Sequence, residues 1–205
     1  MYVNEYLSFH DLQQEEKEGL DYTILFFPRD SEIAVIAPHG GGIEPGTTEI
    51  AKAIASDRFS FYTLEGTKPQ GNKRLHIASE RFDEDRAYRI TQASKIVVTI
   101  HGCCGYENWV FIGGLALAER KRIAQRLLGA GFQVDIDPPK PLAGRHKNNI
   151  CNRGINGRGI QIEIDKSIRE AMFRSLSRDG RKKTTIIFDK FVEAIRSELD
   201  AYSCS

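Results

Sequence analysis

Two histidines stand where apolar runs of the chain give way to glycine. His39 follows the run Glu32–Ala37 (EIAVIA), and His101 follows Lys95–Ile100 (KIVVTI). Glu44 lies five residues after His39, so a loop must bring the two together. One such histidine is usually structural, but two of them with a nearby glutamate favour a set of metal ligands. Two imidazoles and a carboxylate, with a fourth position left for water, are the ligands of a catalytic zinc ion.

The glycines after His39 allow another interpretation, a loop that holds phosphate at the start of a helix. The spacing does not favour it. A P-loop needs Gly-x4-Gly-Lys-Ser/Thr, but Asn72 occupies the lysine position after Gly66–Gly71. The dinucleotide pattern Gly-x-Gly-x-x-Gly also fails, because Pro45 stands at the third glycine. The sequence therefore favours a metal site over a phosphate site.

A further carboxylate lies in the run Gly159–Ile164 (GIQIEI). Its isoleucines alternate with Gln161 and Glu163, as expected of a strand whose two faces differ. Burial near the end of such a strand would raise the pKa of Glu163 toward the range of a general base. Taken alone, Glu163 is better explained as a residue on a solvated face of the sheet. Beside a metal site it becomes a candidate to activate water.

Positive charge is concentrated in one part of the chain. Residues 139–183 carry twelve Lys and Arg against four Asp and Glu, whereas the whole protein has a net charge of +1. This segment is either a solvated surface or a site for an anionic ligand. Arg153 within it, and Arg74 in the run GNKRLH, could bind carboxylates in a bidentate manner. Each, taken alone, is more often a surface ion pair.

Other reactive residues have weaker patterns. His76 and His146 could also be ligands, but neither ends an apolar strand. Cys103 and Cys104 are adjacent, fit no zinc motif and are interpreted as loop or core thiols. The aromatic residues Tyr106 and Trp109, on the loop after His101, either wall a pocket or pack in the core.

Length and composition exclude several classes. The 205 residues are 40 % hydrophobic and 28 % charged with balanced signs, which predicts one folded domain over residues 1–205 rather than disorder. No apolar run approaches the roughly 20 residues that span a bilayer, and the N-terminus lacks a secretory signal pattern. We therefore expect a cytoplasmic protein without a membrane partner. Four cysteines are too few for a disulfide scaffold.

Short apolar runs alternate with helical patterns along the chain. Such alternation predicts an α/β domain with an open, mostly parallel or mixed sheet and helices on both faces. Ligands bind at the carboxyl ends of the strands in such sheets. The expected strands are 22–27, 32–37, 59–63, 95–100, 133–137 and 159–164, and the expected helices are 48–56, 82–93, 114–128 and 184–202. The segment 138–158 is expected to be irregular.

Several motifs together resemble the poly-γ-glutamate hydrolases of phages and bacilli. The resemblance covers about residues 20–195, in the order of the family. Its stretches are PHGGGIEPGTTE (38–49), GNKRLHIASERFDE (71–84), IHG (100–102), GGL (113–115) and NICNRGINGRGIQIEI (149–164). The family resembles a shortened zinc carboxypeptidase. The chain departs from it at Cys103–Cys104, where the family's loop is more polar.

The resemblance implies one zinc ion per chain, held by His39, Glu44 and His101. It places Glu163 as the general base, and Asn72, Arg74 and Arg153 as contacts to the carboxylates of the substrate. The implied activity is endo-cleavage of γ-glutamyl amide bonds in poly-γ-glutamate.

Two alternatives to this activity stay open. One is a zinc peptidase or amidase acting on peptidoglycan γ-glutamyl bonds. The other is a phage replication-associated protein that binds nucleic acid through its basic segment, which leaves His39, Glu44 and His101 without a role. Because the polymer is extracellular, release of the protein on phage-induced lysis would bring it to its substrate.

Overall fold

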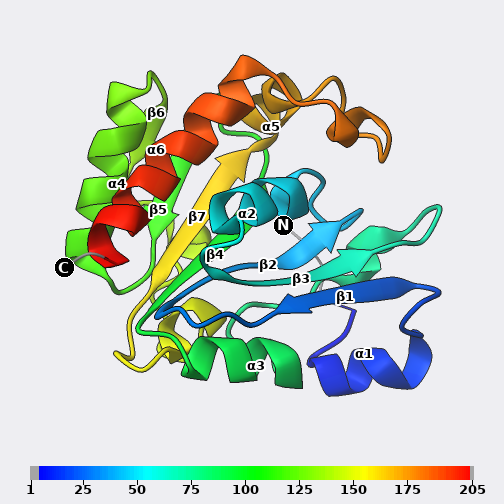
Figure 1. The fold of residues 1–205 in the computed structure, drawn as a ribbon. Helices are drawn as coiled ribbons and strands as arrows, with labels where there is room; N and C mark the ends of the chain where they lie inside the picture. Colours follow the sequence, from blue (N-terminus) through cyan, green and yellow to red (C-terminus); the bar gives the residue numbers. More distant parts are fainter. Residues whose placement is uncertain (1–4, 204–205) are drawn as a thin grey trace.

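The computed structural model of the protein describes residues 5–203, and Figure 1 shows its fold. Seven strands form one sheet in the order β1-β3-β2-β4-β7-β5-β6. The strands are β1 (Tyr22–Phe27), β2 (Ile33–Gly41), β3 (Ser60–Gly66), β4 (Ile96–Cys103), β5 (Trp109–Gly113), β6 (Gln133–Asp135) and β7 (Ile160–Asp165). The helices are α1 (Phe9–Glu15), α2 (Thr47–Ala55), α3 (Asp85–Gln92), α4 (Leu117–Gly129), α5 (Lys166–Met172) and α6 (Ile186–Ser203). The predicted domain 1–205 includes residues 1–4 and 204–205, which lie outside the described residues.

The sheet is mixed, with a parallel centre. Strands β3, β2, β4 and β7 run parallel to their neighbours in this order, whereas β1 is antiparallel to β3 and β5 is antiparallel to β7. The predicted α/β sheet is therefore confirmed. Strand β5 was not predicted, because Trp109 was placed on a loop. Four of the five residues of β5 are buried, so this short run lacks the alternation that identifies an exposed strand.

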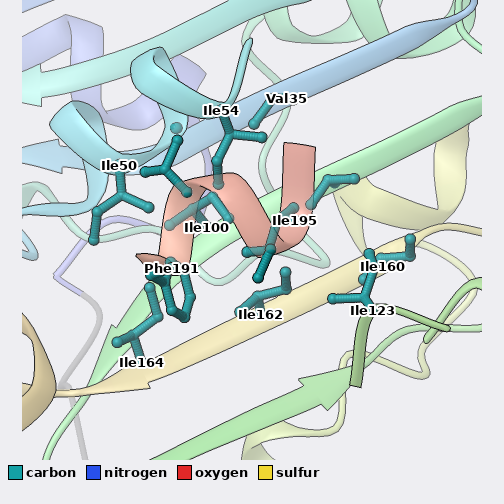
Figure 2. Close-up of a cluster of buried hydrophobic side chains, with 14 of the residues drawn as sticks. Val35, Ile50, Ile54, Ile100, Ile123, Ile160, Ile162, Ile164, Phe191 and Ile195 are labelled. Carbon is teal, nitrogen blue, oxygen red and sulfur yellow. The ribbon is translucent and has the colours of Figure 1, made fainter. Parts of the chain in front are cut away.

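One face of the sheet is covered by α2, α4, α5 and α6 (Figure 1). Figure 2 shows aliphatic side chains of the central strands packed beneath this layer. Ile50 and Ile54 of α2 and Phe191 and Ile195 of α6 belong to this buried cluster. Each fully buried side chain of this size contributes about 1.5–3 kcal/mol relative to an exposed one. This cluster therefore holds the parallel strands together beneath the site.

The opposite face is covered by α1 and α3 (Figure 1). Its core contains Ile36, Tyr62, Ile77 and Phe82, all fully buried. The predicted presence of helices on both faces is therefore confirmed. Helix α3 begins at Asp85 rather than at the predicted residue 82, because the Glu84 carboxylate accepts a hydrogen bond from the Ala87 N–H and caps the helix.

Other boundaries differ from the sequence prediction for local reasons. Helix α4 begins at Leu117 rather than 114, after Gly114 has turned the chain with a φ of +93°. Helix α6 begins after Thr184, which forms a β-bridge with Phe173. Strand β6 is two residues shorter than expected, and α1 and α5 were not predicted.

The segment 138–158 is irregular, as predicted, apart from two short 3-10 turns. It is held in place by Asn152, whose amide nitrogen donates to the carbonyls of Gly144 and His146. The amide oxygen of the same side chain accepts from the N–H groups of Leu115 and Gly159. Among residues 5–203, no helix combines the length and apolar character needed to cross a bilayer.

Candidate metal centre

A β-bulge in β2 sets the direction of His39. Ala37 pairs with Thr63 and Gly40 pairs with Glu65, so β2 holds one residue more than β3 between these pairs. Both Ala37 and Gly40 face the α2 layer, where a Cβ on Gly40 would meet the Thr63 hydroxyl at 2.2 Å. Regular alternation from Ala37 would place His39 on that same face. The bulge instead turns His39 to the opposite face, as bulges do beside functional sites.

The three predicted ligands converge at the carboxyl ends of β2 and β4. His39 Nδ1 lies 3.2 Å from His101 Nδ1 and 3.3 Å from Glu44 Oε1. His101 Nδ1 lies 3.7 Å from Glu44 Oε2. All three side chains are buried, and one ligand atom from each lies within 4.8 Å of the others. The residues predicted from spacing therefore form one cluster.

Hydrogen bonds around the cluster leave nitrogen lone pairs for a cation. His39 Nε2 lies 2.7 Å from the Ile77 carbonyl, so this nitrogen carries the proton and Nδ1 keeps its lone pair. His101 Nε2 is buried with no hydrogen-bond partner in the described chain. The Gly102 N–H donates to Glu44 Oε2 over 2.8 Å and fixes the carboxylate. This donor set fits a zinc-type cation.

The electrostatics of the cluster match that fit. Burial lowers the pKa of His101 to about 3, so the ring is neutral near pH 7. Burial alone would raise the pKa of Glu44. The neighbouring histidines, His39 foremost, together have the larger effect and lower this pKa to about 2. Neutral imidazoles and an ionised carboxylate are the protonation states in which these groups bind metals.

His76 lies beside this cluster without being one of its three residues. Its ring centroid lies 4.0 Å from that of His39, and its Nε2 lies 3.7 Å from Glu44 Oε1. It follows the 3-10 turn Asn72–Leu75 and ends no strand, so the rule that identified His39 and His101 did not select it. Its position within the GNKRLH motif was the available signal. His146, the other possible ligand, is exposed and lies 3.9 Å from Glu80, away from the cluster.

Glu163 lies next to this cluster on β7. It is the register partner of His101, and Gln161 Nε2 donates to its Oε1 over 3.0 Å. Burial raises the pKa of Glu163 well above its usual value, and the charge of Glu44 raises it further. The expected burial of this carboxylate is confirmed, and its catalytic role stays a prediction.

The proposed carboxylate contacts have partners within the chain. Asn72 Oδ1 accepts from the Lys68 N–H, and its Nδ2 donates to the Lys68 carbonyl. Arg74 contacts Glu5 at 2.9 Å and Glu16 at 3.1 Å, so it already binds carboxylates. The role of both residues in substrate binding stays a prediction.

Arg153 lies on the surface beside α3. Its Nε donates to the Asn148 carbonyl over 2.7 Å, and its guanidinium lies 4.7 Å from the centroid of the Tyr88 ring. These contacts orient the side chain without using a carboxylate. A contact between Arg153 and substrate is therefore also still a prediction.

The residues after His101 separate into buried and exposed groups. Cys103 ends β4 and is buried, and Cys104 is exposed. Trp109 begins β5 instead of lying on the loop, and it stacks on Phe111 with ring centroids 6.2 Å apart. Tyr106 packs edge-on against the same phenylalanine at 4.9 Å. Phe111 is the β5 partner of Glu163, so this aromatic group borders the candidate base.

The fold is an α/β sheet whose carboxyl edge carries two histidines and a glutamate that could hold a metal ion. The sequence model of the poly-gamma-glutamate hydrolase family matches residues 6–194. The chain belongs to this family.

The chain is also similar to proteins of Bacillus subtilis strain 168. The chain is 34 % identical over 183 residues to the SPbeta prophage-derived UPF0714 protein YoqZ and 35 % identical over 180 residues to the UPF0714 protein YndL. These alignments cover 89 % and 87 % of this chain. They cover 66 % of YoqZ, just under two thirds of its length, and 71 % of YndL.

Two solved structures share the whole fold. A bacteriophage poly-gamma-glutamate hydrolase matches with a TM-score of 0.94 and 30 % identity, over 98 % of each chain. A zinc-free apo form of YndL matches with a TM-score of 0.91 and 33 % identity, over 98 % of this chain and 99 % of that one.

Proposed function

We propose that this protein is a zinc-dependent hydrolase that cleaves γ-glutamyl amide bonds within poly-γ-glutamate, with residues 1–205 as one catalytic domain. The observation that carries the proposal is the convergence of His39, Glu44 and His101 in a member of this hydrolase family. The relative YndL has a structure in a zinc-free form, which supports zinc as the metal. Three ligands from one chain imply one zinc ion per chain.

In the proposed mechanism the chain holds the metal and moves one proton. Zinc bound at this site would polarise the scissile carbonyl and lower the pKa of water toward about 7. Glu163, buried beside His101, takes a proton from the attacking water. Hydroxide adds to the amide carbon, the carbon–nitrogen bond breaks, and Glu163 returns the proton to the leaving amine. The hydroxide of the water thus becomes part of the new carboxyl group, and its proton is carried by the new amine.

The charge of the chain suits a polyanionic substrate. Poly-γ-glutamate carries one carboxylate per residue, and the basic segment 139–183 would attract it in a manner that weakens with added salt. Arg74, Arg153 and Asn72 are the proposed contacts to its carboxylates. The ion pairs of Arg74 with Glu5 and Glu16 support a role for its guanidinium in binding such groups.

The proposal is tested by incubating the purified protein with poly-γ-glutamate, with and without a chelator, and measuring polymer length together with metal content. Endo-cleavage shortens the mean length before free glutamate accumulates. We expect this result with close to one zinc per chain and its loss after chelation. Cleavage that persists without metal would overturn zinc dependence. The assignment of poly-γ-glutamate as the substrate would be overturned if the protein left this polymer intact and cleaved peptidoglycan fragments. It would also be overturned if salt-sensitive DNA binding were the only activity found.

A further inference from the structure

Arg169 is a buried arginine whose guanidinium binds three separate segments of backbone. It lies in α5, directly after β7, and is 4 % exposed. Its Nε donates to the Ile164 carbonyl over 3.0 Å, its Nη1 to the Pro45 carbonyl over 2.7 Å, and its Nη2 to the Cys103 carbonyl over 2.9 Å. All three nitrogens of the guanidinium therefore have partners.

Each of the three carbonyls belongs to a residue within two positions of a site residue. Pro45 follows Glu44, Ile164 follows Glu163, and Cys103 lies two residues after His101. One side chain thus connects the loop after β2 with the ends of β4 and β7. The loop carries Glu44, β4 carries His101, and β7 carries the candidate base Glu163. A planar guanidinium fixes the relative positions of its three partners because its donor directions are fixed.

Gly102 makes room for this arrangement. A Cβ at Gly102 would lie 2.5 Å from Cζ of Arg169, so any larger residue would displace the guanidinium. The Gly102 N–H is also the donor that holds Glu44 Oε2. The guanidinium therefore packs against Gly102, which directly follows His101 and whose N–H holds the Glu44 carboxylate.

We propose that Arg169 is a positioning residue that fixes Glu44, His101 and Glu163 in one arrangement before metal or substrate binds; the importance of this arrangement for activity rests on the proposed function. The charge of Arg169 interacts with the Glu163 carboxylate, and the three carbonyls accept from its buried N–H groups. A lysine cannot replace it, because one ammonium cannot reach three carbonyls in these directions.

The chain contains a matched control for this side chain. Arg120 in α4 is also buried and also donates to three backbone carbonyls, those of Ile112, Gly114 and Ile136. Its partners lie around β5 and β6 and next to none of the site residues. Replacing Arg120 with lysine removes a similar set of bonds without touching the arrangement around Glu44.

The first measurement needs no metal. Hydrogen exchange of the Gly102 amide is measured in the metal-free protein, relative to that of Val98 in the middle of β4, so that global unfolding cancels. In Arg169→Lys we expect the Gly102 amide to exchange at least about tenfold faster relative to Val98, because the segments that hold it are released. In Arg120→Lys the ratio should equal that of the wild type.

The second measurement uses zinc. In Arg169→Lys, chelator competition should show zinc affinity lower by about 10- to 100-fold, the usual effect of losing a group that orients ligands. On poly-γ-glutamate, kcat should fall while KM changes little. Arg120→Lys should lower the Tm of the metal-free and zinc-loaded forms equally and keep its zinc affinity.

An unchanged exchange ratio, or equal loss of zinc affinity in both variants, would overturn the role of Arg169. If the wild type binds no zinc and leaves the polymer intact, the proposed function fails, but the exchange ratio still decides whether Arg169 positions these segments. If Arg169→Lys does not fold, Gly102→Ala displaces the same guanidinium and should change the same ratio. An unchanged ratio in that variant would also overturn the role.

Discussion

His101 and Glu163 are direct partners in the parallel pair of β4 and β7. Residues paired in this way on neighbouring strands point to the same face of the sheet. The candidate base therefore lies on the same face as a metal ligand without being one of the three clustered residues. This relationship separates metal binding from proton transfer and makes the two independently testable.

Glu163→Gln should remove proton transfer and leave metal binding intact. Glutamine keeps the shape of the side chain, but its amide cannot accept a proton at neutral pH. We expect turnover of poly-γ-glutamate to fall by at least about 10²-fold, the lower range for loss of a positioned general base. Substrate affinity should change far less, because the lost interaction belongs to the transition state. Kinetics and metal analysis on the same preparation measure both.

Glu65→Gln is the matched control, since Glu65 lies near the end of β3 and pairs with Gly40 on the α2 side of the sheet. It should keep both activity and zinc. Near-normal turnover of Glu163→Gln would identify another group as the base, and loss of zinc from that variant would show that Glu163 is a ligand.

The double substitution His39→Ala/His101→Ala should abolish zinc binding and activity. It leaves Glu44 as the one remaining member of the three-residue cluster, which is too few ligands to hold zinc. Zinc content after dialysis, measured by elemental analysis, checks this outcome. The control is His146→Ala, because His146 is exposed and should not affect zinc. Full zinc occupancy in the double variant would contradict the assignment.

Arg153→Ala should weaken catalysis on the polymer without loss of zinc. A charge-assisted contact of a guanidinium with a carboxylate contributes about 1.5–3 kcal/mol, so kcat/KM should fall about tenfold or more. Arg158→Ala serves as the control, because Arg158 is an exposed arginine of the same basic segment. Equal kinetics for Arg153→Ala and the wild type, with the fold retained, would show that Arg153 does not contact the substrate.

Asp165→Asn should lower stability at neutral pH and have little effect in acid. Burial raises the pKa of Asp165, but hydrogen bonds from the Ser167 hydroxyl and N–H and from the Tyr106 N–H lower it below its usual value. A lowered folded-state pKa stabilises the protein above the unfolded value of about 3.9, and this contribution is lost as pH falls through the folded value. Near pH 7 we expect a loss of about 1–2 kcal/mol in the free energy of unfolding.

Urea denaturation of both proteins at several pH values measures this difference, which should shrink below about pH 4. Asp179→Asn is the control. Its ion pair with Lys182 is exposed, so the free energy of unfolding should hardly change. A difference between Asp165→Asn and the wild type that is independent of pH would contradict the assignment to the carboxylate charge.

The amino-acid sequence by itself determined the sheet class and the identity of the clustered residues. Apolar runs ended by His39 and His101, and the alternation around Glu163, are properties of short segments. Parallel strands bring their carboxyl ends to one edge, so these residues could be placed together without knowing the order of the strands.

Tertiary structure decided what depends on pairing between distant segments. The bulge that turns His39 toward His101 exists only in the register of β2 against β3. His76 reaches Glu44 from a turn, and Arg169 reaches Pro45 from 124 residues away. No spacing rule selects such residues, because their partners are backbone carbonyls and side chains brought near only by the folded sheet. Sequence patterns report the local conformation of the chain, whereas these contacts depend on which strands become neighbours.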